Sequence, residues 1–248
     1  MKNKLIRISK IISHSGFTSR RDAEDLIRKG MVKINGKIFT EFFIKNNLIK
    51  KIEVSGKIIK KSKTKVWLFN KPSGYVSSNK EQKDQKSLFR LIPKEIPRVV
   101  SVGRLDIKSQ GLLLLTTNPS FSTFLENPIN KIKRNYIVEV KGEIPREFES
   151  SKNQTFIIDG IIYSNVKIQI QGKIKDKIII DIELVEGKNR EIRKIMSFFG
   201  LKIYLLKRVS FGPFCLGNLK PRSLEEINNK KIKKYMDKLG FSDENNIW

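Results

Sequence analysis

The stretch VGRLDIKSQGLLLLTTN, residues 102–118, joins a polar turn to an unbroken apolar run, and it decides the architecture of the larger part of the chain. The leucines at 112–115 are too few for a helix, follow a glycine and end at Thr-Thr-Asn-Pro, which is typical of a buried central strand. Asp106 then lies on the tight turn that enters this strand. A carboxylate beside apolar surface stays ionised when a cation pairs with it, so we expect an arginine nearby. From spacing alone, a structural ion pair that braces the turn is an equal alternative.

The composition limits the possible domain organisation and chemistry of the chain. Its 248 residues, 39% hydrophobic and 31% charged, allow a small module joined to a larger domain. Because no run of eighteen apolar residues and no signal-peptide pattern is present, we expect a cytoplasmic protein. The only cysteine and the only histidine, Cys215 and His14, exclude an internal disulfide and are too few for a zinc site. We therefore expect neither metal chemistry nor thiol chemistry.

A formal net charge of +26 predicts a polyanionic partner. The chain shows no long basic amphipathic helix with an aromatic face, so nucleic acid is favoured over a membrane surface. Lysine dominates the basic residues as part of a general compositional bias, which makes the arginines more informative, because their planar fork matches phosphate and carboxylate. The arginines concentrate at Arg20, Arg21, Arg104, Arg190, Arg193 and Arg208.

Residues 5–39, LIRISKIISHSGFTSRRDAEDLIRKGMVKINGKIF, predict two short helices and a β-hairpin. Apolar residues at helical spacing form the first helix, and Ser19 with Asp22 fits a capping box that begins the second. The Asn35-Gly36 pair between alternating residues predicts the hairpin turn. The second helix then presents fixed cations outward, although a solvated helix face with no partner is the simpler alternative.

The remainder predicts mainly strands. A strand is expected at 66–70, and stretches rich in β-branched residues predict strands at 136–140, 161–171 and 177–185. A further strand is expected at 75–78 after a Lys-Pro-Ser-Gly turn, and LFRLI at 88–92 is a short helix or strand. A basic helix in NREIRKIMSFFG, 189–200, has apolar residues at i, i+3, i+4 and i+7. The predicted fold class is α+β: a small helix-helix-hairpin module plus a larger domain with a mixed, mainly antiparallel sheet flanked by helices, which we expect on one side.

Two sets of motifs resemble known families. SRRDAEDLIRKGMVKINGK, 19–37, resembles the S4-type RNA-binding domain. The blocks LFNKPSGYV (68–76), GRLDIKSQGLLLLTTN (103–118), RNYIVEVKG (134–142) and EGKNREIRKIM (186–196) resemble, in order and spacing, the RsuA/RluB-type pseudouridine synthases. This resemblance implies an S4-type domain at 1–55, a linker at 56–64, a catalytic domain at 65–228 and a basic C-terminal helix and tail at 229–248.

The resemblance implies that uridine in RNA is converted to pseudouridine without a cofactor or metal. The glycosidic bond breaks, the base turns and C5 joins the sugar. Only Asp106 lies in a catalytic-looking block, whereas a glycosidase usually needs two facing carboxylates. Carried over residue by residue, the family's roles make Asp106 the catalytic carboxylate, Arg193 its charge partner, Tyr136 the stacking residue and Arg104 the support for the emptied RNA helix. RNA contacts are further implied for Lys71, Arg190, Arg20, Arg21 and Arg28.

The Asn-Arg pair at 189–190 is closer to the large-subunit branch of this family. We therefore expect 23S ribosomal RNA, or a ribosome-assembly intermediate, as the partner of a monomeric protein. Modification of small-subunit RNA is one alternative, and a non-catalytic RNA-binding assembly factor is another. Relatives commonly carry Thr-Glu where this chain has Ser109-Gln110, and Asn-Asp-Gly where it has Asn118-Pro119-Ser120; neither departure falls on a residue to which the resemblance assigns a role.

Overall fold

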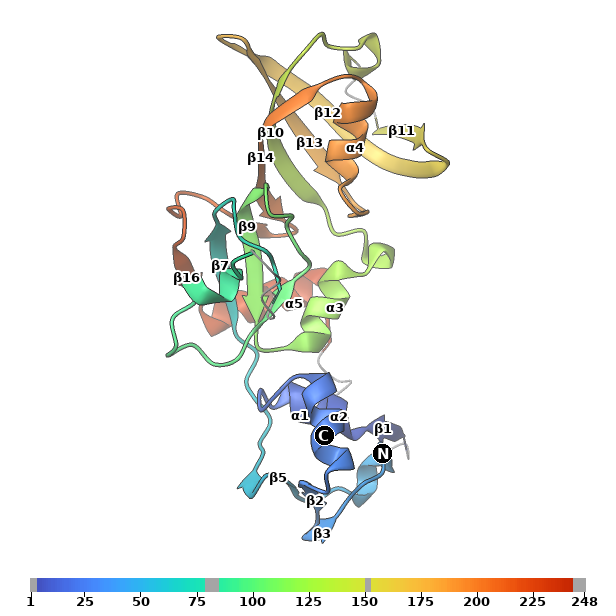
Figure 1. Ribbon diagram of the computed structural model, residues 1–248, viewed down its shortest axis with the longest axis vertical. Coiled ribbons are helices and arrows are strands. Elements are labelled where there is room, and N and C mark those ends of the chain that lie inside the picture. The colour runs from blue at the N-terminus through green and yellow to red at the C-terminus, as the bar shows by residue number, and fades with distance from the viewer. Residues whose placement is uncertain (1–3, 79–84, 150–152, 243–248) are drawn as a thin grey trace.

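The computed structural model describes residues 4–78, 85–149 and 153–242, in which an N-terminal module (blue to cyan in Figure 1) precedes a larger domain. The module combines two helices with a two-stranded and a four-stranded antiparallel sheet, the latter in the order β3-β2-β5-β6. Its elements are β1 Leu5–Arg7, α1 Ile8–His14, α2 Arg20–Arg28, β2 Val32–Ile34, β3 Lys37–Ile38, β4 Phe43–Lys45, β5 Ile52–Val54 and β6 Lys57–Ile58.

Local sequence signals account for this module. Ser19 caps α2 by accepting a hydrogen bond from the backbone N–H of Asp22, as predicted. Asn35 and Gly36 both have positive φ, 51° and 86°, which is the geometry that a two-residue hairpin turn requires, and the predicted β2–β3 hairpin is confirmed. The module ends later than predicted, because β6 completes its sheet and Ile59 is buried in its core, so the first residues of the expected linker belong to the module.

The larger domain is organised around one sheet, to which the described residues contribute ten strands in the order β11-β12-β13-β10-β14-β9-β7-β16, with β8 beside β9 and β15 beside β14. All pairs are antiparallel except β9 with β14, so the mixed, mainly antiparallel sheet is confirmed. The strands are β7 Val66–Lys71, β8 Val100–Val102, β9 Gln110–Thr116, β10 Arg134–Lys141, β11 Asn153–Ile158, β12 Ile161–Ile174, β13 Lys177–Leu184, β14 Lys202–Phe211, β15 Phe214–Cys215 and β16 Leu224–Glu226.

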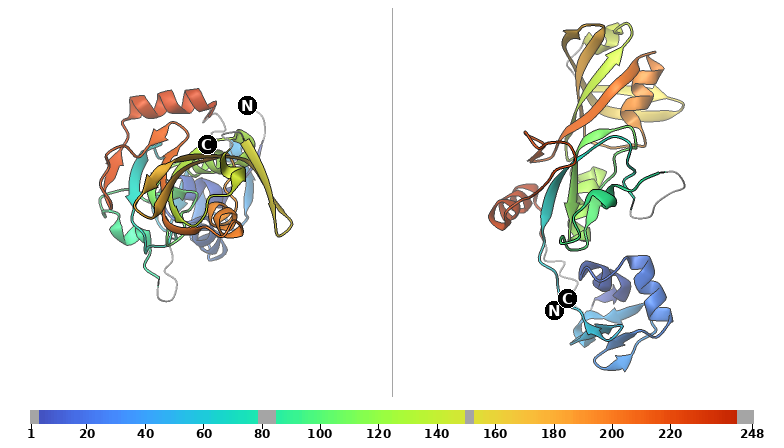
Figure 2. Two further views of the ribbon diagram at one scale, coloured as in Figure 1. Left: turned by 90° about the horizontal axis from the view of Figure 1, so that it is seen from above. Right: turned by 60° about the vertical axis from the view of Figure 1, so that its left-hand side comes forward.

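Strand β9 is the buried central strand that its four leucines predict, with all four inaccessible to solvent. Because successive side chains of a strand point to opposite faces, Leu113 and Leu115 join one apolar core and Leu112 and Leu114 join another. Each buried leucine contributes about 1.5–3 kcal/mol. Helix α4, Glu191–Phe198, packs in the first core. Helices α3, Pro119–Glu126, and α5, Asn229–Leu239, pack in the second (Figures 1 and 2), so helices cover both faces rather than one.

One other prediction differs from the structure: residues 75–78 form only an isolated bridge, Val76 with Ser87, rather than a strand. LFRLI, expected as a short helix or strand, forms the 3-10 helix Leu88–Leu91. Helix α3 was not expected, although Asn118 and Pro119 are a helix-start signal: the Asn118 side chain accepts from two backbone N–H groups. Further 3-10 turns lie at Asn46–Leu48, Pro128–Asn130 and Arg146–Glu149.

Gly111 at the start of β9 brings this strand unusually close to β14. Its φ of +99° disfavours other residues, and a Cβ atom there would stand 2.3 Å from the carbonyl oxygen of Arg208. The Arg208 Nε in turn donates to the carbonyl of Leu112 at 2.7 Å. This close approach fixes the start of β9, and with it the end of the preceding turn, beside β14.

Candidate active site

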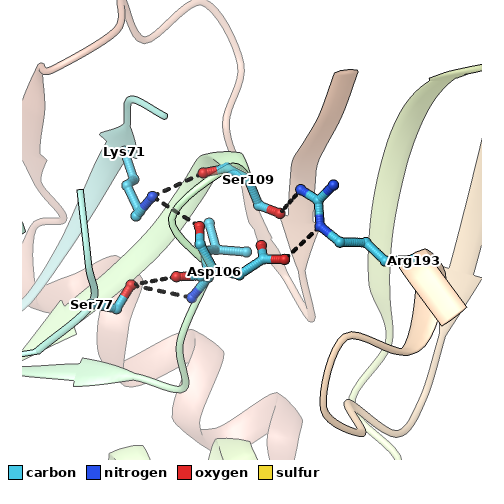
Figure 3. Close-up of polar contacts among 6 residues, drawn as sticks. Lys71, Ser77, Asp106, Ser109 and Arg193 are labelled. Carbon is cyan, nitrogen blue, oxygen red and sulfur yellow. Dashed lines mark hydrogen bonds and ion pairs between the residues drawn. The ribbon is translucent and has the colours of Figure 1, made fainter. Parts of the chain in front are cut away.

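The Asp106 turn, residues 103–109, leads from β8 to β9 and is held from the β7 side. Gly103 starts it with a φ of +65°, and the Ser109 N–H closes it on the Asp106 carbonyl at 3.0 Å. Lys71, the last residue of β7, donates from Nζ to the carbonyls of Asp106 (3.2 Å) and Ser109 (2.9 Å), as Figure 3 shows, and to that of Pro72 (3.1 Å).

This geometry corrects the expectation that Lys71 contacts RNA. The side chain is fully buried, and its three bonds all go to backbone carbonyls of the protein. Burial lowers the pKa of Lys71 to about 8, although the negative charge of Asp106 acts in the opposite direction. Lys71 therefore stabilises the Asp106 turn through hydrogen bonds to its backbone and does not point toward a ligand.

Ser77 holds the same turn from another side, and nothing in its sequence context indicated this. Its hydroxyl donates to the Leu105 carbonyl at 2.9 Å and accepts from the Leu105 N–H at 3.2 Å (Figure 3). Both backbone groups of the residue before Asp106 are thus satisfied by one buried side chain.

Arg193, which lies on α4, binds the Asp106 carboxylate. The arginine expected beside this carboxylate is therefore present. Its Nε donates to Asp106 Oδ2 at 2.6 Å, and its Nη2 donates to Ser109 Oγ at 2.9 Å (Figure 3). The apolar side of α4 faces the core, as its spacing predicts, which leaves Arg193 free to face the turn. The Asp106 side chain stays 31% exposed and that of Arg193 15% exposed, so the pair is shielded but reachable.

The pKa of Asp106 is lowered from its ordinary value. Burial by itself would raise it, but side-chain hydrogen bonds from Ser109 and Arg193 and the positive charges of Arg193 and Arg190 outweigh burial. A carboxylate in this setting is ionised at neutral pH, which either nucleophilic attack or proton abstraction requires.

Asp106 lines a cavity of about 830 Å³ between the Asp106 turn, strands β10 and β14, and the start of α4. The four residues that the resemblance places around the carboxylate, Arg104, Tyr136, Arg190 and Arg193, all line it too. Tyr136 on β10 presents a largely buried ring, whereas Arg104 and Arg190 are exposed.

Three buried charged residues to which the sequence assigned no site role also line this cavity. Arg134 and Arg208 are buried on neighbouring strands, with their guanidinium groups 4.7 Å and 5.2 Å from the ring centre of Phe211. Glu191 is buried at the start of α4, and burial raises its pKa. Asp106 is therefore not the only carboxylate of the cavity, and the argument from a single carboxylate does not hold. The sequence held one signal for this second carboxylate: Glu191 lies two residues before Arg193 in the motif EGKNREIRKIM, 186–196.

The arginines expected to bind RNA on the N-terminal module lie on its surface. Arg20 and Arg21 are exposed at the start of α2. Arg28 is exposed as well, but it pairs with Asp25 at 3.0 Å and lies over the Phe42 ring. None of the three lines the Asp106 cavity.

Both domains of the chain match known protein families. Residues 65–198, more than half of the chain, match the family described as RNA pseudouridylate synthase, and residues 6–41 match the S4 domain. The chain belongs to the RNA pseudouridylate synthase family. The synthase is thus an isomerase with an N-terminal S4 RNA-binding domain, and the recognised motifs and fold class are confirmed.

Relatives along the whole length agree. The synthase is 40% identical over 229 residues to an uncharacterized RNA pseudouridine synthase of Rickettsia felis, covering 92% of this chain and 99% of the relative. It is 32% identical to the ribosomal large subunit pseudouridine synthase B of Bacillus subtilis, covering 92% and 94%. A crystal structure of a pseudouridylate synthase has the same fold, with a TM-score of 0.66 and 22% identity over 93% of this chain and 99% of that one. No helix in the part of the chain that the structure describes is long and apolar enough to cross a membrane.

Proposed function

We propose that the synthase isomerises a uridine of large-subunit (23S) ribosomal RNA and that Asp106 is its catalytic carboxylate. The observation that carries the catalytic assignment is the 2.6 Å pair of Asp106 with Arg193, partly exposed at a cavity of about 830 Å³. The substrate assignment rests on relatives: proteins of Bacillus subtilis and Buchnera aphidicola, 32% and 33% identical, are named ribosomal large subunit pseudouridine synthase B. The Asn-Arg pair at 189–190 supports the same branch.

A uridine inside folded RNA reaches such a cavity only after it leaves its stack, at a cost of a few kcal/mol. Stacking on the ring of Tyr136 would return about 1–3 kcal/mol of this cost. Arg104 is exposed beside the cavity and is our candidate for the side chain that supports the emptied position in the RNA.

Asp106 then acts on the sugar, either by attacking C1′ or by removing a sugar proton. On both routes the N1–C1′ bond breaks, the base turns, and a C5–C1′ bond forms. C5 loses its proton and N1 gains one, so the product is an isomer of the substrate. Both routes need the ionised carboxylate that Ser109, Arg193 and Arg190 favour.

Binding of the rest of the RNA is assigned to the S4 domain. Arg20 and Arg21 project from the exposed start of α2, and with Arg28 they supply cations for phosphates. We propose that the synthase acts as a monomer on 23S RNA or on a ribosome-assembly intermediate.

The test is to map pseudouridine chemically in the 23S and 16S RNA of a strain that lacks the protein. We expect one 23S site to disappear, to return with the wild-type gene, and to stay absent with Asp106→Asn. A lost site in 16S RNA would overturn the substrate assignment. Restoration by the Asp106→Asn variant would overturn the catalytic one, and loss of no site at all in either RNA would overturn both assignments.

A further inference from the structure

Ser109 stands where the charged groups of the site meet. It is 1% exposed and immediately precedes β9. Its N–H donates to the Asp106 carbonyl, its own carbonyl accepts from Lys71, and its hydroxyl accepts from Arg193 Nη2 at 2.9 Å (Figure 3). Although the resemblance assigns no role to Ser109, its backbone and side chain contact Asp106, Lys71 and Arg193.

The second contact of Arg193 determines the orientation of its guanidinium group. A guanidinium donates several N–H groups in a rigid planar fork. Held only by its Nε bond to Asp106, this plane could still turn about that bond. Held also through Nη2 by Ser109 Oγ, it has one orientation, in which Nε points at Asp106 Oδ2 at 2.6 Å.

The hydroxyl proton of Ser109 has a matching acceptor. A hydroxyl that accepts from Arg193 still has its own proton to donate, and an ionised carboxylate can only accept. A side-chain hydrogen bond from Ser109 is among the interactions that lower the pKa of Asp106, ahead of the hydrogen bond from Arg193. Ser109 thus lies between the carboxylate residue of the site and its cation: its N–H donates to the Asp106 carbonyl at 3.0 Å, and its hydroxyl accepts from Arg193.

We propose that Ser109 is a positioning residue of the synthase, whose hydroxyl oxygen orients the Arg193 fork and, through the Nε of Arg193, the Asp106 carboxylate. The inference rests on the proposed catalytic role of Asp106. It assigns a role to Ser109, the first residue of the Ser-Gln pair that replaces the Thr-Glu common in relatives. It predicts that catalysis depends on the hydroxyl of this side chain, which threonine also carries.

The experiment compares Ser109→Ala and Ser109→Thr in the full-length protein. Thr116→Val is the matched control, because Thr116 also carries a buried hydroxyl on β9 that donates to a backbone carbonyl, that of Lys65, at the far end of the strand. Turnover is measured on 23S RNA isolated from the strain that lacks the synthase, as kcat and KM across the acidic pH range, with Asp106→Asn measured on the same RNA.

We expect Ser109→Ala to lower kcat about 10- to 100-fold, the range for a hydrogen bond to a charged group, with little change in KM. The acid limb of kcat moves to higher pH, because the pKa of Asp106 rises when the hydroxyl is lost. Ser109→Thr restores both quantities, and Thr116→Val changes neither.

Unchanged kcat and an unmoved acid limb in Ser109→Ala would overturn the inference. So would equal losses in Ser109→Ala and Thr116→Val, which would show a general effect of removing a buried hydroxyl. Activity in Asp106→Asn would instead overturn the proposed active site itself, so the two failures are distinguishable.

Discussion

Replacing Lys71 by methionine tests whether a buried ammonium group holds the Asp106 turn. Methionine keeps the length of the side chain but removes the donor to three carbonyls. The Asp106 carbonyl keeps the Ser109 N–H as a partner, and the bond to Pro72 is only partly buried, so the main loss is the buried bond to the Ser109 carbonyl. Leaving that acceptor unpaired costs about 1–3 kcal/mol, and removing a buried charge returns part of it.

We expect Lys71→Met to lower the thermal midpoint by about 2–10 °C, at about 2–4 °C per kcal/mol for a chain of this size. The effect on catalysis is larger, because a shift of about 1 Å in a catalytic group costs about 100-fold in rate. Trp67 is buried on the same strand and reports unfolding of this domain by fluorescence once Trp248 is replaced by phenylalanine. Turnover is measured well below the midpoint.

The matched control is Lys65→Met, immediately before β7. Lys65 pairs with Glu226 at 2.9 Å on the surface, and such pairs contribute about 0–1 kcal/mol, so kcat should not change. Wild-type kcat and stability in Lys71→Met would refute the role of the ammonium group in holding the turn. Weaker RNA binding with unchanged kcat would instead restore the direct RNA contact that the sequence predicted for Lys71.

Three further predictions follow from the same structure. Arg193→Gln removes a hydrogen bond and a charge that lower the pKa of Asp106, so the acid limb of kcat/KM should move to higher pH; an unmoved limb in the pH–rate profile contradicts this. Gly111→Ala places a Cβ atom 2.3 Å from a backbone oxygen of β14 and should lower the free energy of unfolding in urea by more than about 3 kcal/mol; a loss under about 1 kcal/mol would show that β9 can move away. The double variant Arg20→Gln and Arg21→Gln should weaken RNA binding and reduce the slope of log K against log salt by about 1–2, with kcat at saturating RNA unchanged; an unaltered slope argues against phosphate contacts at α2.

Features that depend on neighbours in the chain were predictable from the sequence. The cap at Ser19, the Asn35-Gly36 turn, the buried strand at 112–115 and the apolar side of α4 all agree with the structure. Capping, turn geometry and side-chain periodicity act over a few residues, so local sequence determines them. The sequence also predicted that a cation pairs with Asp106, because a partly buried carboxylate needs a counter-charge. This need does not depend on where in the chain the cation comes from.

Only the tertiary structure decided which side chains hold the Asp106 turn. Lys71 reaches Ser109 across 38 residues of chain, Ser77 reaches Leu105 across 28, and Arg193 reaches Ser109 across 84. Strand order and register set these partners, and no spacing in the sequence encodes them. The burial of Lys71 follows from the same cause: the family resemblance implied a basic residue for RNA, whereas the turn packed over it leaves its ammonium group only the protein's own carbonyls to bind.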